Sequence, residues 1–299
     1  MSHTLRVTLG QHADRGRKPV QQDFHGACVP LEPQLGSKGI ALAVADGISS
    51  SDVSHIASET AVASFLSDYF STPDTWSVKT AVQRVLAATN AWLYAQTRQS
   101  EHRYDRDRGY VCTLSALVLK ATSAHLFHAG DTRIYRLRGG SLEPLTADHR
   151  VSVAPGQSYL ARAMGLGPHL ELDYQAHALD VGDIFLCATD GVYEHLSAQQ
   201  IVRCVAEHGD DLDGAAKALV TDALAAGSDD NLTAQIVRVD ALPAADAADL
   251  PAQSKHLPSP PLLSPRTVFE GYRIVREIHA SHRSHVYLAV DETRARRLP

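Results

Sequence analysis

Two stretches of this chain share one design, an apolar run that ends in Asp-Gly. Residues 40–45 (IALAVA) lead to Asp46 and Gly47, and residues 184–189 (IFLCAT) lead to Asp190 and a second glycine. Short apolar runs with β-branched residues and abrupt ends are typical of buried strands. A strand holds its last carboxylate rigidly, and we expect the glycine after it to leave with a positive φ.

Three further acids stand near predicted strand ends. Asp131 follows HLFHAG, Asp230 precedes the predicted strand 233–239, and Asp23 closes RKPVQQD. Gathered in one place, such carboxylates are costly unless a hard divalent cation neutralises them, and Mg²⁺ prefers oxygen ligands. Two cations roughly 3.5–4 Å apart can activate a water for attack on phosphorus. A lone Asp-Gly, however, is more often a hairpin turn, so spacing alone leaves both interpretations open.

Composition limits the alternatives. The 299 residues allow one large domain or two smaller ones, and 44% hydrophobic residues supply a sizeable core. A net charge of −6 without a run of Lys and Arg weighs against nucleic acid as a partner. The four cysteines form no C-x-x-C pair, which predicts free thiols rather than a zinc site. No signal peptide or membrane span is expected, so the predicted location is cytoplasmic.

The fold class follows from helical stripes placed before a dense series of strands. Val62, Phe65 and Leu66 share one helical face, and residues 78–93 form a second stripe. Several short apolar segments follow, with a hairpin turn predicted at Gly139-Gly140. This order predicts a layered α+β domain rather than an alternating parallel fold.

Taken in order, the motifs resemble the metal-dependent protein phosphatases of type 2C, a serine/threonine phosphatase family. The resemblance spans residues 5–240, and its segments are VQQDFHG, AVADGISSS, RGYVCTLSALVL, FHAGDTRIYRL, LTADHRV, LARAMGLG, GDIFLCATDGVYE and GSDDNLTAQIV. It implies a phosphatase domain over residues 1–240. The implied fold is a four-layer α-β-β-α sandwich with two central antiparallel sheets.

The resemblance also implies a ligand set for two or three Mn²⁺ or Mg²⁺ ions. Asp46 would bridge two ions, with the Gly47 carbonyl on one of them. Asp190 and Asp230 would complete the shell of the other ion, with Asp229 as the local competitor of Asp230. Asp131, together with Asp190, would hold a weaker third ion.

Other residues take catalytic roles by the same resemblance. Asp23 would orient water, and Lys18 or Arg17 would bind the phosphate of a phosphoserine or phosphothreonine protein. The implied reaction is direct attack by a water activated by two metals, without a covalent enzyme intermediate. The alternative for Lys18 and Arg17 is a pair of solvated surface cations. Many bacterial relatives carry a longer flap where this chain has RVSVAPGQSY, and Asp148 just before it is interpreted as a loop cap.

The C-terminal part has another character. Residues 241–265 are rich in Pro and Ala and are interpreted as a linker. Residues 266–299 resemble the first two strands of a protein kinase N-lobe, with His279, Ser281 and Ser284 where a kinase has its glycine-rich loop. We expect a truncated kinase fragment that forms a marginal hairpin or a disordered tail. Its presence suggests descent from bacterial proteins that join such a phosphatase to a kinase.

Two other functions remain open. One is a non-catalytic, phosphatase-like regulator of a partner kinase, whose mark would be loss of the metal acids. The other is a two-metal nuclease, against which the missing basic groove weighs. The predicted partners are phosphorylated protein substrates and a cognate kinase, with no nucleic acid and no membrane.

Overall fold

The computed structural model describes residues 4–154, 157–243, 262–269, 271–280 and 285–291. The chain divides into two compact units, Met1–Ala252 and Gln253–Pro299. No helix within the described ranges is long and apolar enough to cross a membrane.

The first unit is built on two five-stranded sheets whose strand pairs are all antiparallel. One sheet has the order β1 (Arg6–Asp14), β12 (Leu232–Ala241), β11 (Ile184–Ala188), β6 (Arg133–Arg138) and β7 (Ser141–Pro144). The other has the order β10 (Asp173–Ala178), β5 (Ser123–Ala129), β4 (Leu114–Lys120), β3 (Ile40–Asp46) and β2 (Asp23–Cys28).

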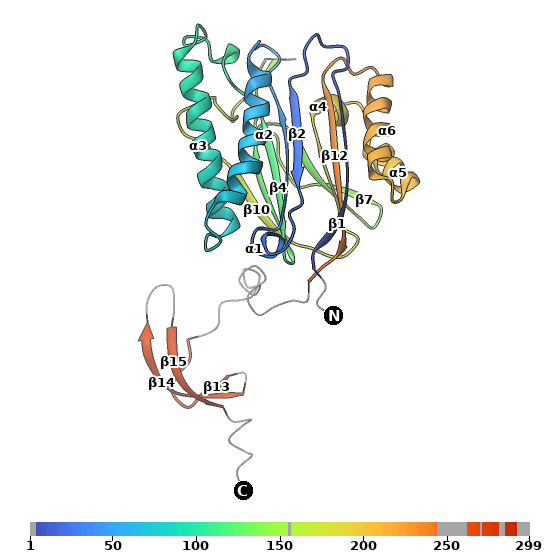
Figure 1. Cartoon of the computed structure of the whole chain (residues 1–299). Helices are drawn as coiled ribbons and strands as arrows, with labels where there is room; N and C mark the ends of the chain where they lie inside the picture. The colour runs from blue at the N-terminus through green and yellow to red at the C-terminus, as the bar shows by residue number, and fades with distance from the viewer. Residues whose placement is uncertain (1–3, 155–156, 244–261, 270, 281–284, 292–299) are drawn as a thin grey trace. The chain divides into compact units, whose positions relative to one another are not determined.

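Helices cover the outer face of each sheet (Figure 1). The sheet that contains β3 is covered by α2 (Ser54–Ser71) and α3 (Val78–Gln99), and the sheet that contains β12 by α5 (Ala198–His208) and α6 (Leu212–Ala225). Shorter elements are α1 (Gln34–Lys38), a 3-10 turn at Arg106–Arg108, α4 (Asp190–Tyr193) and a hairpin of β8 (Arg150–Ala154) and β9 (Gln157–Leu160). The predicted four-layer sandwich is confirmed.

The apolar run of β3 is continuous because both of its faces are buried. Leu42 and Val44 point between the sheets, where they share a core with Phe185. Ala41 and Ala43 point the other way, and their small side chains let α2 lie close to the sheet. This alternation is the period of two expected for a strand buried on both sides.

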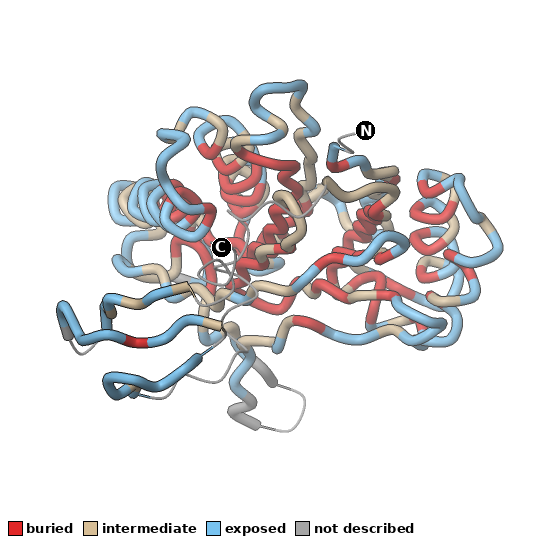
Figure 2. Tube along the Cα trace, turned by 90° about the horizontal axis from the view of Figure 1, so that it is seen from below, coloured by how far each residue is buried: buried red, intermediate tan, exposed pale blue. Residues whose placement is uncertain are grey.

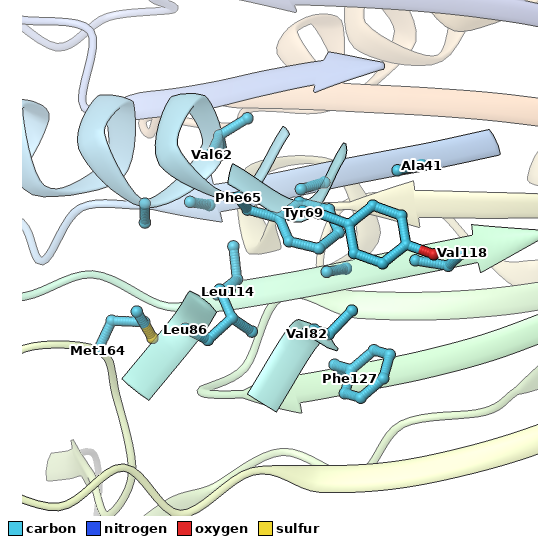
Figure 3. Packing of buried hydrophobic residues seen from close by; sticks show 14 of the residues in the cluster. Ala41, Val62, Phe65, Tyr69, Val82, Leu86, Leu114, Val118, Phe127 and Met164 are labelled. Carbon is cyan, nitrogen blue, oxygen red and sulfur yellow. The ribbon is translucent and has the colours of Figure 1, made fainter. Parts of the chain in front are cut away.

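The core under α2 and α3 contains the largest buried side chains. Phe65 and Tyr69 of α2 stack with ring centroids 5.9 Å apart above β3 and β4, and Leu86 reaches in from α3 (Figure 3). Burying one such side chain contributes roughly 1.5–3 kcal/mol. Figure 2 shows that buried residues follow the strands and the sheet-facing sides of these helices, whereas the loops are exposed.

Local signals set several element ends. Gly139 and Gly140 have φ of +57° and +78°, and they close the predicted hairpin between β6 and β7. Ser197 caps α5 by accepting a hydrogen bond from the backbone N–H of Gln200, whose own side chain reaches back to the N–H of Ser197. This reciprocal pair satisfies donors that a helix start leaves free.

The second unit contains one small antiparallel sheet of β13 (Val268–Phe269), β14 (Tyr272–Ala280) and β15 (His285–Asp291). Several of its apolar side chains are exposed, among them Val275, Ile278 and Leu288. Ser281, Ser284 and most of the predicted linker, residues 244–261, lie outside the described residues. The assignment of this unit to a kinase N-lobe stays a prediction.

Candidate metal centre

In one cavity of about 380 Å³, four of the predicted acids come together from different segments of the chain. Asp46, Asp131, Asp190 and Asp230 line it together with Gly47. Asp46 ends β3, and Asp190 begins α4 directly after β11. Asp131 lies in the turn after β5, and Asp230 precedes β12. The two sheets therefore place at one point carboxylates that are far apart in the sequence.

Asp23 lies beside this group and is buried. It stands directly opposite Asp46 in the β2–β3 pair, and its side chain is 5% exposed. Its Oδ2 accepts hydrogen bonds from the hydroxyls of Thr189 at 2.9 Å and Thr233 at 2.7 Å. Its Oδ1 is buried and has no hydrogen-bond partner among the described residues. Burial, opposed by the threonine hydrogen bonds, raises the pKa of Asp23 to about 6.

Asp46 is half-buried and lies close to four other acids. Burial, followed by the charges of Asp23, Asp190, Asp131 and Asp230, holds the pKa of Asp46 well above its usual range. Its main chain is fixed, because its N–H donates to the Thr113 hydroxyl at 3.0 Å and its carbonyl accepts from the Thr113 N–H at 2.8 Å. A carboxylate held rigidly among four others needs a positive partner.

Lys18, predicted as a phosphate ligand, reaches the cavity wall. Its Nζ lies 3.0 Å from Asp230 Oδ2 and donates to the Ser49 hydroxyl at 3.1 Å. Ser49 is itself a lining residue. Arg17, the competing candidate, is exposed. Of the two basic residues, Lys18 is the one in contact with the acidic cluster.

A second cation, Arg150, was not predicted from the sequence. It lines the cavity, and its guanidinium pairs with Asp131, with Asp190 at 2.8 Å and with Glu194 at 3.2 Å. Asp131 is 5% exposed, and its pKa is raised because burial outweighs the attraction of Arg150. The only sequence signal for Arg150 was its position directly after LTADH, and nothing in that segment indicated which residues Arg150 contacts.

The donor set suits a hard divalent cation. Among the described residues no three His, Cys, Asp or Glu side chains are already arranged around one ion position. Asp131, Asp190 and Asp230 instead pair with basic side chains. The cavity offers carboxylate oxygens together with Gly47, and its described lining contains no His or Cys. Oxygen donors of this kind favour Mg²⁺ or Mn²⁺ over zinc. The buried Asp23 Oδ1, which has no hydrogen-bond partner among the described residues, is a further carboxylate acceptor next to this group.

Asn231 is a further residue that the sequence did not single out. Its side chain is almost completely buried, accepts from the Gln22 N–H at 2.8 Å and donates to the carbonyls of Arg15 at 2.8 Å and Val20 at 3.1 Å. It thereby ties the loop that carries Lys18 to the segment next to Asp230. Its position directly after Asp230 was the only available signal.

A positive φ was predicted for the glycine of each Asp-Gly pair, and this prediction is wrong. Neither Gly47 nor Gly191 has a positive φ. Glycine is needed there because the backbone is crowded: a Cβ on Gly47 would lie 2.7 Å from the Ser54 carbonyl oxygen, and one on Gly191 would lie 2.0 Å from that of Asn231. The glycine with positive φ at this site is Gly130, at +115°, just before Asp131.

The raised pKa of Asp190 predicts that Asp190→Asn stabilises the metal-free protein near neutral pH. Burial, then the charges of Asp131 and Asp230, raise this pKa from 3.8 to about 7. The folded chain therefore keeps a proton that the unfolded chain has lost. The associated stability is present below about pH 4 and disappears as the pH rises through about 7.

The neutral amide of the Asp190→Asn variant does not titrate, so this loss of stability at higher pH does not occur. In chelator at about pH 8 we expect a higher Tm for Asp190→Asn than for the wild type, at roughly 2–4 °C for each kcal/mol relieved. The advantage should shrink towards about pH 5. Thermal unfolding across this range measures it, and a wild type that is the more stable protein at the upper pH would speak against the repulsion inferred here.

Known proteins share both the sequence pattern and the fold. The protein phosphatase 2C family model matches residues 11–235. A putative protein phosphatase 2C-type protein from Streptococcus pyogenes is 26% identical over 225 residues, which cover 68% of this chain and 83% of that protein. Among solved structures, the serine/threonine phosphatase of S. agalactiae superposes with a TM-score of 0.68 at 24% identity, over 79% of this chain and all of that one.

A related structure contains metal. The catalytic domain of the serine/threonine protein phosphatase PstP, in complex with two manganese ions, has a TM-score of 0.66 and 22% identity over 80% of this chain and all of that one. Together the fold, the acidic cavity and the relatives define a metal-dependent protein phosphatase. The chain belongs to the protein phosphatase 2C family, because the family model covers most of its length.

Proposed function

We propose that the acidic cavity holds two divalent cations, Mn²⁺ or Mg²⁺, and that it hydrolyses phosphoserine and phosphothreonine in proteins. In this proposal Asp46 would be a ligand of both ions, the Gly47 carbonyl would be a ligand of one of them, and Asp190 and Asp230 would hold the other. The observation that carries it is the convergence of these three carboxylates, with Asp131, on one cavity, where burial and then the charges of the neighbouring acids raise the pKa of Asp46. A weaker third ion is assigned to Asp131 and Asp190.

The remaining residues position the reactants. When bound, the cations acidify a water and neutralise charge that develops on the phosphoryl group. In this proposal Asp23 orients the attacking water through its Oδ1, which has no hydrogen-bond partner among the described residues, while Thr189 and Thr233 hold Oδ2 in place. Lys18 moves its ammonium from Asp230 to the substrate phosphate as a point charge.

Turnover of p-nitrophenyl phosphate by the full chain tests the reaction. We expect activity that requires Mn²⁺ or Mg²⁺ and is abolished by chelator. A phosphothreonine peptide should be dephosphorylated with the same metal requirement. A chain that binds a partner kinase yet shows no metal-dependent turnover would instead favour the non-catalytic regulator.

Lys18 and Arg17 are distinguished by their single alanine variants. We expect Lys18→Ala to reduce kcat/KM for a phosphothreonine peptide by roughly 10–100-fold, mainly through KM, since a charge-assisted hydrogen bond contributes about 1.5–3 kcal/mol. Arg17→Ala, which removes an exposed neighbour, should stay within about threefold of the wild type. A larger loss of kcat/KM in Arg17→Ala than in Lys18→Ala would identify Arg17 as the phosphate ligand.

The setting is proposed as the cytoplasm, with a cognate kinase as a partner. All four cysteines are unpaired, and reduced thiols are usual in that compartment. Residues 241–265 are assigned as a linker and residues 266–299 as the beginning of a kinase N-lobe. The antiparallel pair of β14 and β15 is consistent with the first two strands of such a lobe.

A further inference from the structure

Arg150 places a protein cation where an ion is proposed to bind. It is the first residue of β8, its side chain is 31% exposed, and it lies on the cavity wall. Its Nε donates to Asp131 Oδ2, its Nη2 to Asp190 Oδ2 at 2.8 Å and its Nη1 to Glu194 Oε1 at 3.2 Å. One guanidinium thus joins the two carboxylates assigned to the third ion.

The segment that delivers Arg150 is anchored on both sheets. Asp148 accepts two hydrogen bonds from the guanidinium of Arg133 on β6, at 2.8 and 2.7 Å. Asp148 is therefore an ion-pair partner rather than the loop cap that the sequence indicated. His149 lies 3.0 Å from Asp173 on β10 through Nε2, and its Nδ1 accepts the Gly130 N–H at 3.2 Å. Three consecutive side chains make separate polar contacts around Asp131, so the guanidinium is held in position.

A guanidinium and a divalent ion cannot share the same oxygens. A cation bound by Asp131 and Asp190 needs their oxygens within roughly 2.0–2.6 Å. The N–H groups of Arg150 already occupy the facing lone pairs of one oxygen on each carboxylate. A second positive charge a few ångströms away would be repelled strongly in this partly buried site. Binding of the ion therefore requires Arg150 to leave.

We propose that Arg150 is a built-in competitor of the divalent ion at Asp131 and Asp190, and that it sets the low affinity of this ion. This inference rests on the proposed function, because it needs these carboxylates to be metal ligands. Without the ion, Arg150 neutralises the two acids and stabilises the cavity. With the ion bound, the guanidinium is displaced, and the start of the β8–β9 hairpin loses its contact with the site.

The test is a titration of the metal-free full chain with Mn²⁺ by calorimetry, supported by counting bound manganese after equilibrium dialysis. The variants are Arg150→Ala, Arg150→Lys and the control Arg136→Ala, which removes an ion pair of 2.6 Å to the exposed Glu143 on the same sheet as β6. We expect the weakest Mn²⁺ site to bind about tenfold more tightly in Arg150→Ala, with Arg150→Lys in between and the control unchanged.

Thermal unfolding supplies a second readout. In chelator, Arg150→Ala should melt below the wild type, because the acids lose their counter-ion, and saturating Mn²⁺ should close or reverse this gap. A lower Tm at every Mn²⁺ concentration, with the weakest-site affinity unchanged or reduced, would show a purely structural role and overturn the inference. Arg150→Lys, which keeps the charge, covers the case in which the alanine variant does not fold.

Two further outcomes separate this inference from the proposed function. Two Mn²⁺ ions bound identically by the wild type and by Arg150→Ala, with no additional site in either, would overturn the competition and leave the hydrolase proposal intact. A wild-type chain that binds no Mn²⁺ would remove the proposed function, and the inference with it.

Discussion

An Asp46→Asn variant is expected to lose at least about 10³-fold in kcat/KM on a phosphothreonine peptide in Mn²⁺. Asp46 is the proposed bridging ligand, and burial and the charges of four neighbouring acids raise its pKa well above the usual range. Replacing it with a neutral amide removes charge from both proposed ion positions. Metal stabilisation of a phosphoryl transition state amounts to several kcal/mol, and about 4 kcal/mol corresponds to a 10³-fold change in rate.

The matched control is Asp229→Asn, which alters an exposed acid next to Asp230. It should keep activity within about threefold of the wild type, whereas Asp190→Asn should behave like Asp46→Asn. Circular dichroism and thermal unfolding establish that each variant is folded. Full activity in folded Asp46→Asn and Asp190→Asn would refute the assignment of the site.

The second large effect is expected for Asn231→Ala, at about 2–4 kcal/mol of unfolding free energy. The truncation leaves the buried Gln22 N–H and the part-buried carbonyls of Arg15 and Val20 without their shared partner. Each buried group left unsatisfied costs about 1–3 kcal/mol, and water that enters the gap recovers part of this. Urea unfolding monitored by fluorescence measures the loss.

Asn231→Ala should also weaken catalysis, since Asn231 holds the loop that carries Lys18. A useful comparison is Gln235→Ala, which removes a buried amide that donates to Gln11 Oε1 and to the Gly26 carbonyl, both at 3.0 Å. Gln235→Ala should lower stability while leaving kcat/KM nearly unchanged in the folded protein. If both variants reduced kcat/KM equally, Asn231 would be a structural residue only.

The strands were predictable because their periodicity is local. The run 40–45 identified β3, and the Gly139-Gly140 pair identified a hairpin turn that the structure contains. The acids at strand ends were identified in the same way, because a strand end and the residue after it are neighbours in the sequence. Which acids face one another depends on sheet order and register, for which the motif resemblance, and not periodicity, supplied the expectation.

The long-range ion pairs and hydrogen bonds of the site could not be predicted from the sequence. Arg150 contacts Asp190 across 40 positions, and Asn231 contacts Gln22 across 209. Such contacts are fixed only when both sheets have assembled, so no local pattern encodes them. The glycines illustrate the same limit. Position 191 requires glycine because the carbonyl of Asn231 lies too close for a Cβ, and not because of the φ of Gly191.

The most direct measurement is anomalous diffraction at the manganese edge from crystals of the full chain soaked in Mn²⁺. We expect two strong peaks bridged by the Asp46 carboxylate, with Asp190 and Asp230 on one of them, and a weaker peak between Asp131 and Asp190 from which the Arg150 side chain has moved away. Manganese bound elsewhere, or a cavity in which Asp46, Asp190 and Asp230 contact no metal at saturating Mn²⁺, would contradict this expectation.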